Sequence, residues 1–292
     1  MNHCRTAARI LLVALALADG ARGVAEGTPE RPPDDLIRQT IANELRSADQ
    51  NSNYMFRERK ETPEGSQTKL FVQTREATVG MVVAYNDRPL SKEQRLGEFG
   101  RIQHFIDDPA DLGRKRSKEK EDAERVKRIL RALPDAFLYQ YDGTEPAKPN
   151  VGKPGSELVR LRFIPNPKYE PPSHVEQVLT GMQGVILVDP QTQHLARIDG
   201  TLMKEVGFGW GILGHLDRGG HFLVDQTDVG DNNWSITRME LGLTGKMLLF
   251  KTLNIKSTEI YSDFHRVPDD LTFAQGAELL RKQAAVVAQN QP

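Results

Sequence analysis

The chain has 292 residues, with 39 Lys and Arg against 40 Asp and Glu and a formal net charge of −1. This balance excludes the strong positive field that partners such as nucleic acid or anionic membranes require. The only cysteine is Cys4, so the chain after it has neither a disulfide framework nor a cysteine-based zinc site. Because the chain is long, it is expected to build a core without such staples.

Residues 1–25 have the three-part pattern of a secretory signal peptide. Two arginines precede the apolar run Ile10–Ala18, and small residues that suit cleavage follow it. The run is about half the roughly 20 residues that a spanning helix needs, so no stable transmembrane anchor is predicted. Cys4 precedes the run, whereas the lipid-modified cysteine of a bacterial lipoprotein follows it. We therefore expect a soluble, periplasmic or secreted mature protein.

The first half of the mature chain mixes helix and strand patterns. Residues 26–33 are expected to form a flexible leader. Asp34–Asp49 is predicted to be a helix, because Ile37, Ile41 and Leu45 recur every four residues. The strands predicted next lie at Asn53–Lys60, Thr68–Val79 and Met81–Tyr85.

Two further helices are predicted before the chain becomes mostly strand. Ser91 and Gln94 have the spacing of a capping box, and a helix with apolar residues at helical spacing follows them. The charged segment 108–134 is predicted to be an inserted helix with an apolar stripe at Val126, Ile129, Leu130 and Leu133, and Pro134 is expected to end it. Its cationic side chains suit anionic head groups or a partner protein, but interleaved acids make a solvated helix face the plainer interpretation.

From Ala136 the patterns are mostly those of antiparallel strands. They are Phe137–Tyr141, Glu157–Phe163, Gly184–Val188, His194–Lys204, His221–Asp228, Trp234–Leu243, Lys246–Thr252 and Ile255–Phe264. Turn residues separate them, including Thr244-Gly245. The order predicts an α+β fold in which a long antiparallel meander either closes into a barrel or forms an incomplete half-barrel, with helices covering its concave face. Residues 34–267 would form this single domain, and residues 268–292 a C-terminal helical tail that starts at Pro268-Asp269-Asp270.

No catalytic, phosphate-binding or cofactor-binding signature occurs in the sequence. The nearest approach to one is the segment from His215 through Asp217 to His221, which could ligate a metal in a hydrolase. Its spacing matches neither a zinc protease helix nor a zinc finger, and a polar loop between strands is the alternative. No cofactor, resident metal or catalytic residue is predicted.

Apolar side chains on the strands and turns are the remaining candidates for a binding site. Aromatic rings and thioethers make adaptable walls for an apolar ligand, although an ordinary core has the same composition. The cleft candidates are Met203, Phe208, Trp210, Phe222, Trp234, Met247 and Phe250. The candidates for a lid and mouth are Phe99, Ile102, Phe105, Lys115, Arg116 and Lys118.

Residues 184–202, GVILVDPQTQHLARIDGTL, combine a branched apolar run, an Asp-Pro turn and an alternating strand. With the later Gly- and aromatic-rich strands, this segment resembles secreted bacterial proteins of the lipoprotein-carrier superfamily, of the LolA/LolB type. The resemblance implies an open antiparallel barrel with a helical lid over an apolar cavity. It also implies non-covalent transport of lipids or lipid-modified proteins. The charged segment 108–134 departs from the compact carriers, and no binding residue is carried over.

The leading hypothesis is therefore a periplasmic carrier that holds a lipid, an acyl chain or a lipoprotein non-covalently. An envelope protein with a fully packed sheet, which interacts with a partner protein and holds no ligand, is the second hypothesis. A metal-dependent hydrolase is the third.

Overall fold

The computed structural model describes residues 31–50, 52–208, 214–247 and 251–289. From Pro33 onward the described chain forms one unit. Its helices are α1 (Pro33–Gln50), α2 (Lys92–Asp107), α3 (Pro109–Ala136), α4 (His174–Gln177) and α5 (Phe273–Gln289), with a 3₁₀ turn at Val178–Gly181. In the described part of the chain, no helix is both long and apolar enough to cross a membrane.

Thirteen strands form one antiparallel sheet in the described residues. The first five are β1 (Tyr54–Thr62), β2 (Gly65–Val72), β3 (Val79–Tyr85), β4 (Arg88–Pro89) and β5 (Phe137–Pro146). The next five are β6 (Glu157–Pro165), β7 (Met182–Asp189), β8 (His194–Leu202), β9 (Val206–Phe208) and β10 (Gly214–Leu216). The last three are β11 (His221–Asp228), β12 (Trp234–Met247) and β13 (Lys251–Arg266).

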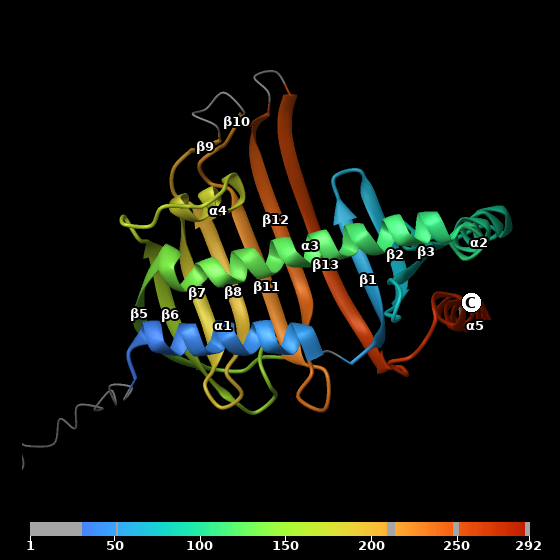
Figure 1. The fold of residues 1–292 in the computed structure, drawn as a ribbon, viewed down its shortest axis with the longest axis horizontal. Helices are drawn as coiled ribbons and strands as arrows, with labels where there is room; N and C mark the ends of the chain where they lie inside the picture. The colour runs from blue at the N-terminus through green and yellow to red at the C-terminus, as the bar shows by residue number, and fades with distance from the viewer. Residues whose placement is uncertain (1–30, 51, 209–213, 248–250, 290–292) are drawn as a thin grey trace, which may run out of the picture. The chain divides into compact units, whose positions relative to one another are not determined.

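The strand order is β4-β3-β2-β1-β13-β12-β11-β8-β7-β6-β5, with β9 and β10 attached beside β12. β4 and β5 stand at opposite ends of this order, so the described sheet is open rather than closed. The long α3 runs across one face of the sheet, and α1 lies beside it on that face (Figure 1). This confirms the predicted α+β fold with an open half-barrel.

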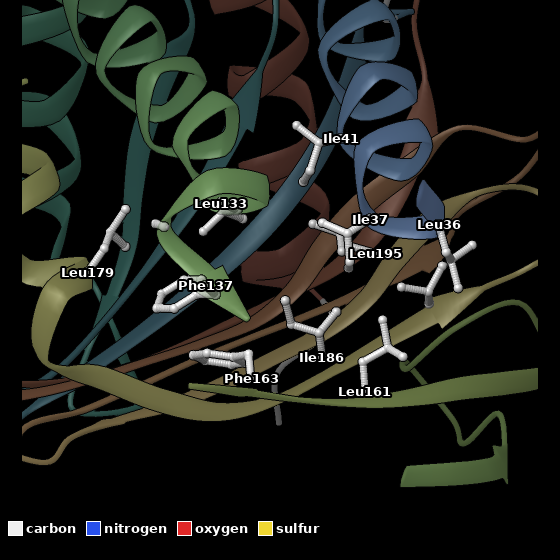
Figure 2. Close-up of a cluster of buried hydrophobic side chains, with 12 residues drawn as sticks. Leu36, Ile37, Ile41, Leu133, Phe137, Leu161, Phe163, Leu179, Ile186 and Leu195 are labelled. Carbon is white, nitrogen blue, oxygen red and sulfur yellow. The ribbon is translucent and has the colours of Figure 1, made fainter. Parts of the chain in front are cut away.

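The main core lies between α1, the end of α3 and strands β5 to β8. Leu36, Ile37 and Ile41 of α1 point toward the sheet (Figure 2) and pack with fully buried Leu161 and Ile186. Each such aliphatic side chain contributes roughly 1.5–3 kcal/mol when buried. The helical spacing that predicted α1 is therefore the spacing of its buried face, and this prediction is confirmed.

A second core lies at the other end of the sheet. There, α2 and α5 pack against β2 and β3 through Ile102, Phe273 and Leu280, among others. The predicted capping box of α2 is confirmed, because Ser91 and Gln94 each accept a hydrogen bond from the other's backbone amide. Helix α5 begins at Phe273 rather than at the predicted Pro268-Asp269-Asp270. It begins there because Thr272 and Gln275 form the same reciprocal cap.

The hairpin of β7 and β8 is confirmed, and α1 is fastened to its turn. Asp189 Oδ1 accepts hydrogen bonds from the amides of Gln191 and Thr192, as an Asp-Pro turn requires. From α1, Glu44 Oε1 lies 3.0 Å from His194 Nδ1 and accepts a 2.8 Å bond from the Leu195 amide.

The predicted turn at Thr244-Gly245 is wrong, because both residues lie inside β12. Gly245 is opposite Leu216 of β10 and Leu253 of β13. A Cβ at Gly245 would lie 2.1 Å from the carbonyl oxygen of His215. Glycine is therefore required there for close approach of another strand, not for a turn.

Two other boundaries differ from the predictions. Strand β2 ends at Val72, because Thr74 Oγ1 donates a 2.6 Å bond to the Ala77 carbonyl and closes a loop where strand was predicted. Helix α3 continues past Pro134 to Ala136, where buried Leu133 and Ala136 hold the last turn in the core. The apolar stripe predicted on α3 is wrong at Val126, which is 60% exposed.

Candidate functional site

The part of the β3 edge that β4 leaves unpaired, from Val79 to Val82, positions the charged side chains of α2 and α3. The Val82 amide donates a 3.1 Å bond to Glu98 Oε2, and Arg101 Nη2 donates a 2.6 Å bond to the Gly80 carbonyl. The Thr78 amide donates a 3.0 Å bond to Glu119 of α3. These side chains replace the strand that would otherwise pair with this edge. They thereby fix both helices beside β2 and β3.

A pocket of about 380 Å³ lies between these helices and the sheet. Sites for small ligands span about 300–1,000 Å³, so this pocket is of ligand size. It is lined by Gln67, Lys69, Phe71, Gly80, Val82, Tyr85, Glu98, Arg101, Ile102, Phe105, Lys115 and Phe273.

Aromatic rings form an apolar wall at this end of the sheet. Phe71 stacks on Phe56 with 5.2 Å between ring centroids, and Phe56 in turn stacks on Phe264 at 5.7 Å. A Cβ at Gly80 would lie 2.7 Å from the Phe71 ring. The absence of a side chain at Gly80 is therefore what lets the Phe71 ring lie against β3.

The lining of the pocket carries more positive than negative charge. Its cations are Lys69, Arg101 and Lys115, and its only acid is Glu98. Arg101 pairs with Glu98 at 2.8 Å and Lys115 with Glu119 at 2.6 Å. In the parts of the chain that the structure describes, Lys69 forms no ion pair. Lys69 is therefore the lining cation with the greatest capacity for a bound anion.

Hydrogen bonds from its neighbours lower the pKa of Glu98. Burial by itself would raise this pKa, but bonds from Arg101 and from the Val82 amide outweigh that effect. Glu98 is therefore charged at neutral pH and remains committed to Arg101 and β3.

A cluster of acids adjoins the pocket on the same face of the sheet. Glu58 of β1 stands directly opposite Lys69 of β2 and opposite Tyr261 of β13. Two residues along β1, Lys60 stands opposite Glu259. Opposite residues in neighbouring strands project from one face, as do residues two apart in one strand. We call Glu58, Lys60, Glu259 and Tyr261 the acid cluster.

Glu259 is the member of the acid cluster best shielded from water, whereas the Lys60 side chain is 41% exposed. The Glu259 side chain is 8% exposed, and its carboxylate accepts bonds from Lys60 Nζ at 2.7 Å and from the Tyr261 hydroxyl at 2.6 Å. Burial raises the pKa of Tyr261, and its bond to Glu259 raises it further. Burial also raises the pKa of Glu58, with the charge of Glu259 second, while Lys69 and Lys60 oppose the shift.

One row of paired residues across the sheet shows where its helix-covered face changes from apolar to polar. Directly opposite partners run from β6 to β3 in the order Leu161, Ile186, Ile198, Val224, Met239, Glu259, Lys60, Gln67 and Tyr85. The row is apolar as far as β12 and polar from β13 onward. All its members share the face that α1 and α3 cover. The change in polarity coincides with the acid cluster and the pocket.

Three of the predicted lid and mouth residues line the pocket, namely Ile102, Phe105 and Lys115. The other three lie outside its lining. The Phe99 ring lies 5.7 Å from the guanidinium carbon of Arg281 on α5, and Arg116 and Lys118 are exposed on α3.

The predicted cleft residues do not come together in the described structure. Phe208 packs in a small cluster with Leu202 and its neighbours, and Met203 is 39% exposed. Phe222 stands opposite Gly200 and Leu241, two residues from Val224, so it lies on the helix-covered face. Trp234 packs with Leu187, which alternates with Ile186 and so lies on the opposite face. Trp210 and Phe250, and the side chain of Met247, lie outside the described residues.

The predicted metal-binding segment is arranged differently from the sequence expectation. His215 Nε2 lies 3.3 Å from Asp217 and 4.0 Å from Glu205, whereas His221 pairs with Asp199 at 3.1 Å. Glu205, His215 and Asp217 could therefore hold a metal ion, and so could His104, Asp108 and Asp111 in the described chain. In the second group Asp108 already caps α3 and Asp111 already pairs with Arg114.

Sequence reasoning named Tyr261 only as apolar material on a strand, and it did not single out Lys69, Phe71, Arg101 or the charged members of the acid cluster. The available signal was weak, because residues 57–61 are all charged and so show no alternation of polar and apolar side chains. Alternation indicates one shared face within a strand, but it does not tell which face the helices cover.

No protein-family model matches the chain, and no curated protein matches it. A solved structure of a DUF1329 family protein from Desulfovibrio piger is similar at 11% identity, with a TM-score of 0.28. The match covers 85% of this chain and 99% of that one. A likeness at this level carries no argument about fold or function. The resemblance to lipoprotein carriers has no support in these comparisons and stays a prediction.

Proposed function

We propose that the protein is a non-covalent binding or carrier protein for a single-chain amphiphile with an anionic head group. The ligand occupies the pocket between β2, β3, α2 and α3. The observation that carries this proposal is the pocket of about 380 Å³, in which an apolar wall adjoins an excess of cations. A fatty acid or a lipid with one acyl chain has this combination of chemistry.

The size of the pocket favours one acyl chain over a larger cargo. Its volume is near the lower end of the range for ligand sites. Each buried methylene contributes about 0.8 kcal/mol, so a chain of moderate length can bind firmly before the costs of ordering it are counted. The anionic head group lies at Lys69, and the chain lies against Phe71, Ile102 and Phe105.

We also propose that the protein does this work in the bacterial periplasm. The support is the signal-peptide pattern of residues 1–25. A carrier in that compartment exchanges lipids between membranes without covalent chemistry, and it needs no cofactor.

The test compares binding of palmitate with binding of uncharged hexadecanol by isothermal titration calorimetry. Reversing the charge at the pocket, in Lys69→Glu, should weaken palmitate binding at least tenfold, and Lys115→Glu should weaken it by less because Glu119 already pairs with Lys115. The matched control is Lys118→Glu on the same helix, whose side chain is 77% exposed and lies outside the lining.

The wild type should bind palmitate more tightly than hexadecanol. The Lys118→Glu control should bind palmitate as tightly as the wild type does. Failure of the wild type to bind palmitate would overturn the proposal. So would equal affinity in all three charge-reversed variants. In either case, a packed envelope protein without a ligand would become the better interpretation.

A further inference from the structure

Lys69 has two environments, and this makes it a link between the pocket and the acid cluster. On one side it lines the pocket. On the other it stands opposite Glu58 across the β1–β2 pair. Opposite residues have Cβ atoms about 4.5–5.5 Å apart, so Lys69 can serve a bound anion or the Glu58 carboxylate.

The other donors in the acid cluster both bind Glu259, and they act on Glu58 more weakly than Lys69 does. Lys60 Nζ lies 2.7 Å from the Glu259 carboxylate. The Tyr261 hydroxyl donates its single proton to Glu259 at 2.6 Å and contributes only the smallest of the effects on Glu58. Glu58 is left with Lys69 as its principal source of positive charge, while Glu259 repels it.

The ordinary ionisation of Glu58 is therefore already disfavoured in the unliganded protein. Burial raises its pKa and the charge of Glu259 raises it further, whereas Lys69, Lys60 and a hydrogen bond with Tyr261 lower it, in that order of size. The other charged groups around the pocket beside Lys69 are Glu98 and Arg101 from α2 and Lys115 and its partner Glu119 from α3. Each of these pairs is internally neutralised.

We propose that binding of an anion at Lys69 is coupled to uptake of a proton by Glu58. The inference rests on the proposed function, because it takes the pocket as the ligand site. A bound anion pairs with Lys69, so Lys69 stabilises the Glu58 carboxylate less. The anion also adds a negative charge beside Glu58. Both effects favour the neutral form of the Glu58 carboxyl. By reciprocity, a protonated Glu58 strengthens anion binding, so affinity rises as the pH falls.

The experiment uses dodecyl sulfonate below its micelle concentration, because a sulfonate keeps its charge across the pH range where Glu58 titrates. Calorimetry in two buffers of different ionisation enthalpy gives the number of protons taken up for each ligand bound. For the wild type we expect uptake of more than zero and at most one proton. As the pH rises by one unit, the base-ten logarithm of the association constant should fall by the number of protons taken up.

The test variant is Glu58→Gln, which keeps the size of the side chain and an acceptor oxygen but does not titrate. Its proton uptake should be zero, and its affinity for dodecyl sulfonate should be independent of pH. The matched control is Glu61→Gln on the same strand. Glu61 is exposed and, being an odd number of residues away, lies on the opposite face. This control should take up protons as the wild type does.

The outcomes separate this inference from the proposed function. Binding of dodecyl sulfonate by the wild type without proton exchange would overturn the coupling and leave the proposed function standing. Undiminished uptake in Glu58→Gln would also overturn it, by assigning the proton to another group. If the wild type binds neither dodecyl sulfonate nor palmitate, the coupling and the proposed function both fail.

Discussion

Replacement of Glu98 by alanine should destabilise the protein by opening the edge of the sheet. The Glu98 side chain is 16% exposed and accepts the bond from the Val82 amide, which belongs to a residue that is 6% exposed. Loss of a buried acceptor leaves a donor unpaired at a cost of about 1–3 kcal/mol. The pair with half-exposed Arg101 adds up to about 1 kcal/mol. We therefore expect a loss of about 2 kcal/mol in the free energy of unfolding.

Urea unfolding at pH 7 measures this loss. Glu98→Gln keeps an acceptor for Val82, so its loss should be smaller than that of Glu98→Ala. The control is Glu121→Ala at an exposed position of α3, which should stay within about 0.5 kcal/mol of the wild type. Equal stability of Glu98→Ala and the wild type would refute the reasoning. Equal losses in the alanine and glutamine variants would refute the role of the Val82 bond.

The pH dependence of this effect has a definite sign. The pKa of Glu98 is lowered in the folded protein, so its contribution is fully present above the ordinary carboxyl range near pH 4 to 5. The contribution is lost as the pH falls through the lowered value. The difference in stability between the wild type and Glu98→Ala should therefore be constant from pH 7 to about pH 5 and should shrink in more acid solution.

Two further predictions concern the β7–β8 hairpin. Gly184→Ala should destabilise by about 3 kcal/mol or more, because its Cβ would lie 1.9 Å from the Asp199 carbonyl oxygen. Gly200→Ala should cost less, because the nearest atom is the movable end of Met182, and equal urea midpoints for the two variants would contradict this. Glu44→Ala should cost about 2–4 kcal/mol, because it leaves the Leu195 amide and His194 Nδ1 without their acceptor. Hydrogen exchange at the Leu195 amide measures the effect, and unchanged protection there would contradict it.

Local chemistry made part of the fold predictable from the sequence. The Asp-Pro turn, the capping box of Ser91 and the apolar spacing of α1 each depend on residues that are close in sequence. These features formed as expected. The same local reasoning failed at Gly245, where the glycine accommodates a strand that pairs from elsewhere in the chain. It also failed at Val126, which lies in the stretch of α3 between Leu112, packed in one core, and Ile129, packed in the other, because helical spacing does not show which stretch of a helix is packed.

The candidate site was less predictable, because its residues come together through the pairing register of strands that are far apart in sequence. Lys69 meets Glu58 through the β1–β2 pairing, and Glu58 meets Tyr261 across 203 positions of sequence through the β1–β13 pairing. A bulge between Met55 and Arg57 shifts that second register. A one-residue slip moves every side chain of a strand to the other face. The pattern of each strand alone therefore could not place these three groups together.

The distribution of polarity under the helices is the strongest reason to regard the β1–β2 end as functional. At the β5–β8 end, the helix-covered face is a dry core that contains Leu161 and Ile186 at 0% exposure. A fold selected for stability alone would continue this core along the row, because buried ionic groups are often no more stabilising than well-packed apolar ones. The row instead becomes polar at Glu259 and Lys60, where the cationic pocket begins. Natural sequences tend to depart from local consistency at functional sites. The pocket and the acid cluster are such a departure from an apolar core. The proton-coupled binding that we propose would explain why charged groups are retained there.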